Sequence, residues 1–95
     1  MSTNYKSKDV SNIFTALGNP IRMKIISILF SSKKPLHIAA ISRALKFDYV
    51  LIYRHVKVLE RNKLVEIYDV GRSRVISPSN PDLIKSLIEL ANKLK

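Results

Sequence analysis

The segment DYVLIYRHVKVLERNKLVEI, residues 48–67, mixes cations, aromatic rings and apolar side chains at helical spacing. At about 100° per residue, one face of such a helix carries Ile52, Val56 and Leu59. The opposite face carries a different set: Val50, Tyr53, Arg54, Lys57 and Arg61. A helix that faces only water would carry small or charged residues there, so a valine and a tyrosine among cations mark this face as the candidate functional surface.

Residues suited to covalent or metal chemistry are scarce. The chain has no cysteine, which excludes disulfides, thiolate metal sites and cysteine nucleophiles. Its two histidines, His37 and His55, lie far apart in sequence without a third ligand, and His55 flanks the apolar stripe, which favours a structural role. No serine–histidine set, paired acidic motif or glycine-rich phosphate loop is present. We therefore expect no catalytic residues, no metal, no cofactor and no enzymatic activity.

The net charge favours a polyanionic partner. Seventeen Lys and Arg against seven Asp and Glu give +10 and an isoelectric point near 10.2. Most of the basic residues lie in the middle of the chain, and no single amphipathic helix carries them. Nucleic acid is therefore the leading expectation and an anionic membrane surface the second. No apolar run is long enough to span a membrane and the N-terminus lacks a signal-like stretch, so we expect a cytoplasmic protein.

The helix at 48–62 belongs to a short series of predicted elements in one domain, residues 9–95, after a flexible basic tail at 1–8. Helical spacing predicts a helix that ends at Gly18, a second that starts after the Asn19-Pro20 capping signal, and a short third from Ile38. Residues 36–37 are expected to be an extended pair. A β-hairpin is expected over 64–77, with a basic tip at GRSR, and a last helix over 80–95. Asp48 and Asn80 are expected to cap the helices that follow them, and Asn62 to end the helix at 48–62. The predicted fold class is mainly α with a small β-hairpin.

Two motifs resemble a known family. LGNPIRMKIISIL, residues 17–29, resembles the LGxPxRxxILxLL opening of ArsR-type winged helix-turn-helix regulators. YRHVKVLERNKLVE, residues 53–66, is similar to that family's SxHLxxLxxxGLV run, and GRSRVISPS, residues 71–79, to its wing. Lys63 stands where the family has glycine and Tyr53 where it has serine, and the family's cysteine metal sensor is absent. The high isoleucine and lysine content without cysteine hints at a thermophile, archaeal or archaeal-virus-like.

The resemblance implies that helix 48–62 enters the DNA major groove and that the hairpin is a wing. The residues it assigns to base contacts are Tyr49, Val50, Tyr53 and Arg54. Those it assigns to the DNA backbone or the wing are Lys33, Lys34, Arg43, Lys46, Lys57, Arg72, Ser73 and Arg74. The alternative for Val50 and Tyr53 is packing against the wing or against the turn, and strand alternation could turn Arg74 away from DNA.

The first and last helices carry more apolar surface than a domain of this size can bury. We expect them to form a two-fold dimer interface. Its predicted residues are Ile13, Phe14, Leu17, Leu83, Leu87, Leu90 and Leu94. The leading hypothesis is a homodimeric, sequence-specific regulator of transcription, most simply a repressor, on a near-palindromic double-stranded operator. The alternatives are a DNA-coating architectural protein and a winged-helix module that docks onto another protein.

Overall fold

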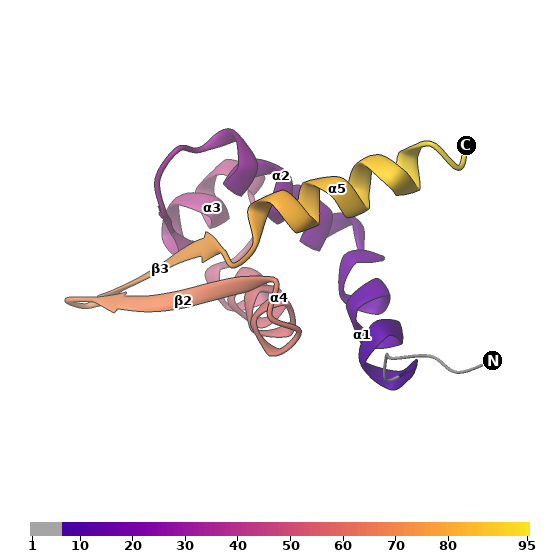
Figure 1. Ribbon diagram of the computed structural model, residues 1–95. Helices are drawn as coiled ribbons and strands as arrows, with labels where there is room; N and C mark the ends of the chain where they lie inside the picture. The colour runs from indigo at the N-terminus through magenta and orange to yellow at the C-terminus, as the bar shows by residue number, and fades with distance from the viewer. Residues whose placement is uncertain (1–6) are drawn as a thin grey trace.

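The chain folds into five helices and a three-stranded antiparallel sheet, as shown by a computed structural model that describes residues 7–95 (Figure 1). Most of the predicted tail at 1–8 lies outside the described residues, and Ser7 and Lys8 are already helical. The elements in chain order are α1 (Ser7–Leu17), α2 (Pro20–Ser31), β1 (Leu36–His37), α3 (Ile38–Leu45), α4 (Tyr49–Arg61), β2 (Val65–Val70), β3 (Ser73–Pro78) and α5 (Pro81–Asn92).

The break between α1 and α2 follows the capping signals in the sequence. The Gly18 amide donates to the Phe14 carbonyl at 2.8 Å and closes α1. The Asn19 side chain accepts hydrogen bonds from the amides of Ile21 at 2.9 Å and Arg22 at 3.1 Å. The prediction that Asn19 caps α2 is therefore confirmed.

Two other capping predictions are confirmed in position only. Asp48 and Asn80 do occupy the N-cap positions of α4 and α5, but neither side chain makes a capping hydrogen bond. The prediction that Asn62 ends α4 is confirmed, since Asn62 is its C-cap residue. Asn62 has a φ of −97°, and the next residue, Lys63, takes the left-handed conformation with a φ of 60°. The Asn62 side chain donates to the Val58 carbonyl at 2.9 Å and ties down the last turn.

The strands pair in the order β1-β3-β2, so the predicted hairpin gains a third strand from the extended pair at 36–37. β2 and β3 pair from Val70 with Ser73 at the tip to Val65 with Pro78 at the base. Gly71 and Arg72 form the turn, and Gly71 has a φ of 61°, which a residue without a side chain adopts at little cost. β3 is thus longer than expected and ends at Pro78.

The core lies between α2, α3, α4 and the sheet. The side chains that are fully buried in it are chiefly isoleucines: Ile25, Ile26, Ile38, Ile52, Ile76 and, at 1% exposure, Ile41. Burial of each such side chain contributes about 1.5–3 kcal/mol. The stripe predicted for α4 is confirmed, since Ile52, Val56 and Leu59 are all at 0% exposure. Burial of this stripe fixes which face of α4 is left outside.

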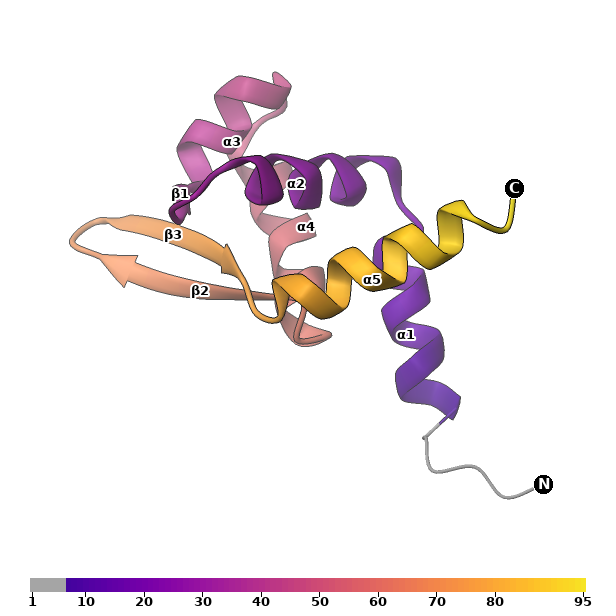
Figure 2. The same ribbon diagram turned by 45° about the horizontal axis from the view of Figure 1, so that its top comes forward.

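The molecule is elongated, 49 × 26 × 23 Å. In both views the hairpin projects at one end, and α1 and the C-terminal end of α5 lie at the other (Figures 1 and 2). α5 contributes a single fully covered side chain, Ile84, to the core. No single described helix is long and apolar enough to cross a membrane; α1 and α2 would suffice only as a pair bent by 82°, and by length and composition alone.

Candidate nucleic-acid interface

The N-terminal half of α4 exposes the face that the sequence marked as functional. Val50 is 59% exposed and Tyr49 is 37% exposed. Arg54 is also exposed, whereas Tyr53 is half-buried and packs against the core. Because Ile52 and Val56 hold the opposite face in the core, rotation of α4 would bury Arg54 and expose isoleucine. The orientation of this face is therefore fixed by the core.

The hairpin is joined to this face through Arg74. The rings of Tyr49 and Tyr53 stack with centroids 6.4 Å apart and planes 8° apart. The Arg74 guanidinium carbon lies 4.9 Å from the Tyr53 ring centroid, and its Nη1 donates to the Tyr49 hydroxyl at a long 3.5 Å. Its Nε lies 4.0 Å from a carboxylate oxygen of Asp69. We call this cluster of Tyr49, Tyr53, Asp69 and Arg74 the wing brace.

The wing brace changes how two predicted contacts are understood. Tyr53 does pack against the hairpin, which was the alternative given for it, and one face of its ring is covered by Arg74. The side chain of Arg74 points toward α4, which is the possibility that strand alternation raised. Its guanidinium therefore contacts Tyr49 and Tyr53 of the same chain. Val50 stays exposed on this face, and the exposed Arg54 makes no side-chain hydrogen bond or ion pair among residues 7–95.

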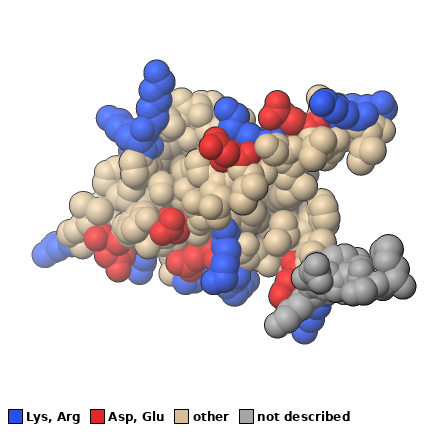
Figure 3. All heavy atoms as spheres, viewed as in Figure 1, with Lys and Arg blue, Asp and Glu red and all other residues tan. Residues whose placement is uncertain are grey.

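The other predicted backbone-binding cations fall into separate groups. Arg72 and Ser73 lie at the hairpin tip beside the start of α4, and Arg43 and Lys46 are exposed at the end of α3. Figure 3 shows basic side chains at the hairpin tip and acidic ones along the hairpin next to it. Lys57 is paired with Glu60 of its own helix at 2.7 Å, and this carboxylate raises the pKa of Lys57.

Lys33 and Lys34 are not brought together with the hairpin tip. They line a hollow of about 390 Å³ with Lys85, beside Pro78 at the base of β3. Because β1 runs antiparallel to β3, its His37 end faces the tip and the preceding lysines lie toward the base. Lys33 and Lys34 therefore lie apart from the hairpin tip, and their predicted contact with the DNA backbone stays a prediction.

Arg22 and His55 are both half-buried and have structural partners. Arg22 donates from Nε to the Ala16 carbonyl at 2.6 Å and from Nη2 to the Thr15 carbonyl at 3.2 Å, and its Nη1 lies 3.0 Å from His55 Nδ1. Burial, and then the charge of Arg22, lower the pKa of His55. Since Arg22 must be the donor, His55 Nδ1 is the acceptor and the ring is neutral. The predicted structural role of His55 is confirmed by this contact between α2 and α4.

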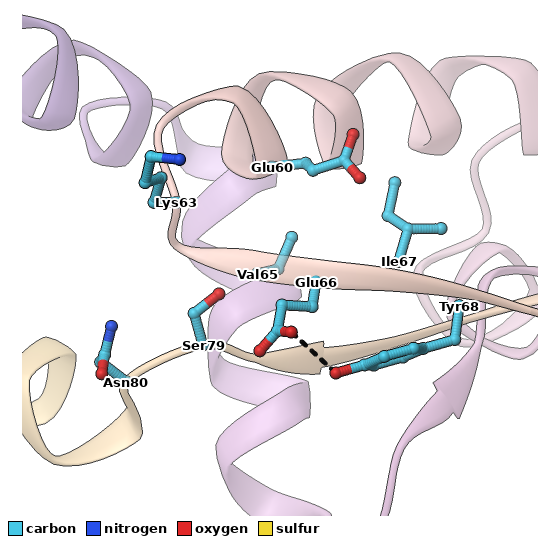
Figure 4. Close-up of a pocket in the computed structure, with 8 residues that line it drawn as sticks. All are labelled: Glu60, Lys63, Val65, Glu66, Ile67, Tyr68, Ser79 and Asn80. Atoms are coloured by element: carbon cyan, nitrogen blue, oxygen red, sulfur yellow. Dashed lines mark hydrogen bonds between the residues drawn. The ribbon is translucent and has the colours of Figure 1, made fainter.

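A groove of about 470 Å³ lies between the C-terminal half of α4 and β2 (Figure 4). Its lining includes the carboxylates of Glu60 and Glu66, and the Tyr68 hydroxyl donates to Glu66 at 2.8 Å. This carboxylate also raises the pKa of Tyr68. Two carboxylates against one lysine, Lys63, in the lining disfavour an anionic ligand, so this groove is a poorer place for DNA than the exposed face of α4.

Solved structures with this arrangement of elements are known. HlyU from Vibrio cholerae matches with a TM-score of 0.78 at 22% identity, over 97% of each chain. A homodimeric winged helix-turn-helix DNA-binding domain from Mycobacterium bovis, Mb0332, a possible ArsR-family regulator, matches with a TM-score of 0.78 at 16% identity, over 97% of this chain and 91% of that one. The chain has the winged helix-turn-helix fold. The resemblance to ArsR-type proteins is confirmed at the level of the fold, with α3 and α4 as the helix-turn-helix and β2–β3 as the wing.

The chain is also similar in sequence to MJ0229 of Methanocaldococcus jannaschii, which is described as an uncharacterized HTH-type transcriptional regulator. The two are 40% identical over 58 residues, which is 61% of this chain and 59% of that protein. The match therefore spans little more than half of the curated relative. No family model matches the sequence.

Proposed function

We propose that the protein is a homodimeric regulator of transcription that binds double-stranded DNA in a sequence-dependent way. In this proposal α4 lies in the major groove, and the wing contacts the flanking DNA. Val50 contacts a thymine methyl group and Arg54 donates to a guanine edge. The exposed cations around them hold the phosphates, and occupancy of the operator blocks access to a promoter.

The observation that carries the proposal is the exposure of Val50 and Arg54 side by side on a helix whose other face is fixed in the core. An apolar side chain next to a guanidinium suits base edges, which offer both methyl groups and paired acceptors. Arg72 at the wing tip adds charge on the same side of the molecule, near the first turn of α4. A DNA coat without base readout would need the cations but not the exposed valine.

The dimer is supported by apolar surface that the single chain leaves uncovered. Phe14 is 55% exposed, Leu83 and Leu90 on α5 are 70% and 61% exposed, and Leu94, just after the end of α5, is 88% exposed. An almost wholly apolar hollow of about 330 Å³ lies between α1, α2 and α5 next to this stripe. Of the residues predicted for the interface, Leu17 is already covered by its own chain, and Ile13 and Leu87 are half-buried.

A second copy on this face would place two α4 helices on successive major grooves, about 34 Å apart. The near-palindromic operator and the repressor role are part of this proposal. The Mb0332 domain is homodimeric, which supports the same assembly here.

Competition binding at two salt concentrations, after selection of duplexes from a random pool, tests the proposal. We expect the selected duplex to outcompete random DNA, with log affinity falling against log salt at a slope near −7 if the dimer neutralises on the order of eight phosphates. Equal affinity for selected and random duplexes would support an architectural coat. Weak DNA binding that does not respond to salt would contradict both and favour a protein-docking module.

A further inference from the structure

The hollow of about 390 Å³ at the base of the wing has an apolar floor. The loop after α2, the base of β3 and the first turns of α5 border it (Figure 1). The apolar lining consists of two side chains of α2, Leu29 and Phe30, and of three prolines, Pro35, Pro78 and Pro81. Leu29 is buried and Phe30 is half-buried. The floor therefore offers contact area to an apolar side chain, which a phosphate group does not have.

The rim of this hollow is basic. Lys33 and Lys34 come from the loop after α2 and Lys85 comes from α5, and the one acid in the lining is Asp82. All four residues are exposed, and none of the three lysine side chains makes an ion pair or hydrogen bond within residues 7–95. Three unpaired ammonium groups against one carboxylate attract an acidic partner.

The chain around the hollow is held in place without a partner. The Ser32 hydroxyl donates to the Lys34 carbonyl at 2.7 Å and accepts from the Lys34 amide at 3.3 Å, which fixes the loop that carries both lysines. Three of the four prolines of the chain lie in the lining, and each restricts its own φ. Little backbone entropy is therefore lost when a partner binds, which favours affinity at a small docking surface.

We propose that this hollow is a docking site for an acidic peptide segment of a partner protein. One apolar side chain of the segment fills the hollow, and the carboxylates that flank it pair with Lys33, Lys34 and Lys85. This inference goes beyond the proposed function and does not depend on it. A partner seated here leaves the exposed face of α4 and the hairpin tip free, because no residue of α4 and none of residues 70–74 lines the hollow. One protomer can therefore hold DNA and the partner together.

Two other occupants fit the hollow less well. DNA phosphates would pair with the lysines but would leave the apolar floor uncovered. A small-molecule site encloses most of its ligand, whereas this hollow is lined mostly by exposed residues. An extended peptide meets both conditions, since it covers an open surface and supplies acidic and apolar groups side by side.

Fluorescence anisotropy with synthetic peptides tests the proposal on the full chain. The probe is a short labelled peptide with phenylalanine at its centre and aspartate and glutamate on both sides. One control peptide carries serine at the centre, and the other carries asparagine and glutamine in place of the acids. We expect the probe to bind wild type at least about tenfold more tightly than either control peptide, and more weakly as salt is raised.

Variants of the lining locate the peptide. Lys33→Ala, Lys34→Ala and Lys85→Ala should each weaken the probe by about two- to fivefold, because each removes one exposed charge pair. Asp82→Asn removes the opposing charge and should strengthen the probe, a gain that misfolding cannot produce. Lys24→Ala is the matched control, since Lys24 is an exposed lysine of α2 outside the lining, and it should bind the probe as wild type does.

NMR titration of the wild type with the probe gives an independent readout. Amide resonances of residues 32–35 and 77–85 should shift, and those of residues 49–54 should not. Shifts confined to residues 49–54 would place the peptide on the face proposed to read DNA and would contradict the docking site.

Three binding results would overturn the inference. No binding of the probe, or equal binding of the serine-centred peptide, would leave nothing for the apolar floor to recognise. Equal losses in Lys24→Ala and in the lining variants would place the peptide elsewhere. Displacement of the probe by duplex DNA, together with lower DNA affinity in Lys33→Ala and Lys34→Ala, would assign these lysines to the DNA backbone. Failure of the wild type to select any duplex would instead contradict the proposed function and leave the peptide result standing.

Discussion

The wing brace predicts that Arg74 acts on α4 from the wing, and Arg74→Ala tests this. The variant loses the cation–π contact with Tyr53, worth about 0.5–1 kcal/mol at an exposed site. The contact with Tyr49 at 3.5 Å and the pair with Asp69 at 4.0 Å add little, because both are long and solvated. We therefore expect the free energy of unfolding to fall by about 1 kcal/mol, or Tm by about 4–8 °C.

Urea unfolding at one fixed protein concentration measures this loss, since the stability of a dimer depends on concentration. A double-mutant cycle with Tyr53→Leu should return a coupling energy of about 0.5–1 kcal/mol. The matched control is Arg72→Ala, because Arg72 makes no side-chain hydrogen bond or ion pair within residues 7–95. A cycle in which Arg74→Ala and Tyr53→Leu add within about 0.3 kcal/mol would refute the brace.

Three further predictions follow from other contacts. Arg22→Ala removes the donors to two carbonyls at the end of α1 and should lower the free energy of unfolding by about 1–2 kcal/mol. The control Lys24→Ala changes an exposed neighbour and should leave this free energy unchanged, so equal effects of the two variants in urea unfolding would contradict the prediction. The pKa of His55 is lower in the folded chain than in the unfolded chain, so the unfolded chain takes up the proton first and the free energy of unfolding should fall as pH drops through 6.5 and below. Over that range the urea midpoint of His55→Gln should fall less than that of the wild type. Parallel curves for the two proteins would contradict the neutral ring. Leu90→Asp places a charge on the exposed stripe of α5 and should give a folded monomer in sedimentation equilibrium, whereas an unchanged dimer would move the interface elsewhere.

The features that the sequence predicted well depend on nearby residues. The Asn19-Pro20 cap, the buried stripe of Ile52, Val56 and Leu59, and the hairpin turn at Gly71 all follow from a few residues with fixed local preferences. The spacing of apolar residues shows which face of a helix is buried even when the element that covers this face is unknown. It therefore predicted the orientation of α4 correctly. The same local reasoning identified Val50 and Arg54 as exposed.

The features that it missed depend on contacts between distant segments. Nothing near His37 in the sequence indicates that it lines a hollow with Arg72 and Ser73, because this follows from the pairing of β1 with β3. The same pairing sends Lys33 and Lys34 to the base of the wing. The alternation of side chains along the strand was the one sequence signal that the Arg74 side chain could point toward α4. It did not indicate that Arg74 would contact Tyr53.

The central claim is that the outer face of α4 reads base pairs. Selection from a random duplex pool by wild type, Arg54→Ala and Lys85→Ala tests it at single-base resolution. We expect wild type and Lys85→Ala to enrich the same two-fold symmetric site, and Arg54→Ala to lose preference at one base pair in each half-site and keep the rest. Identical enriched sites for wild type and Arg54→Ala, or no enrichment by the wild type, would contradict the account.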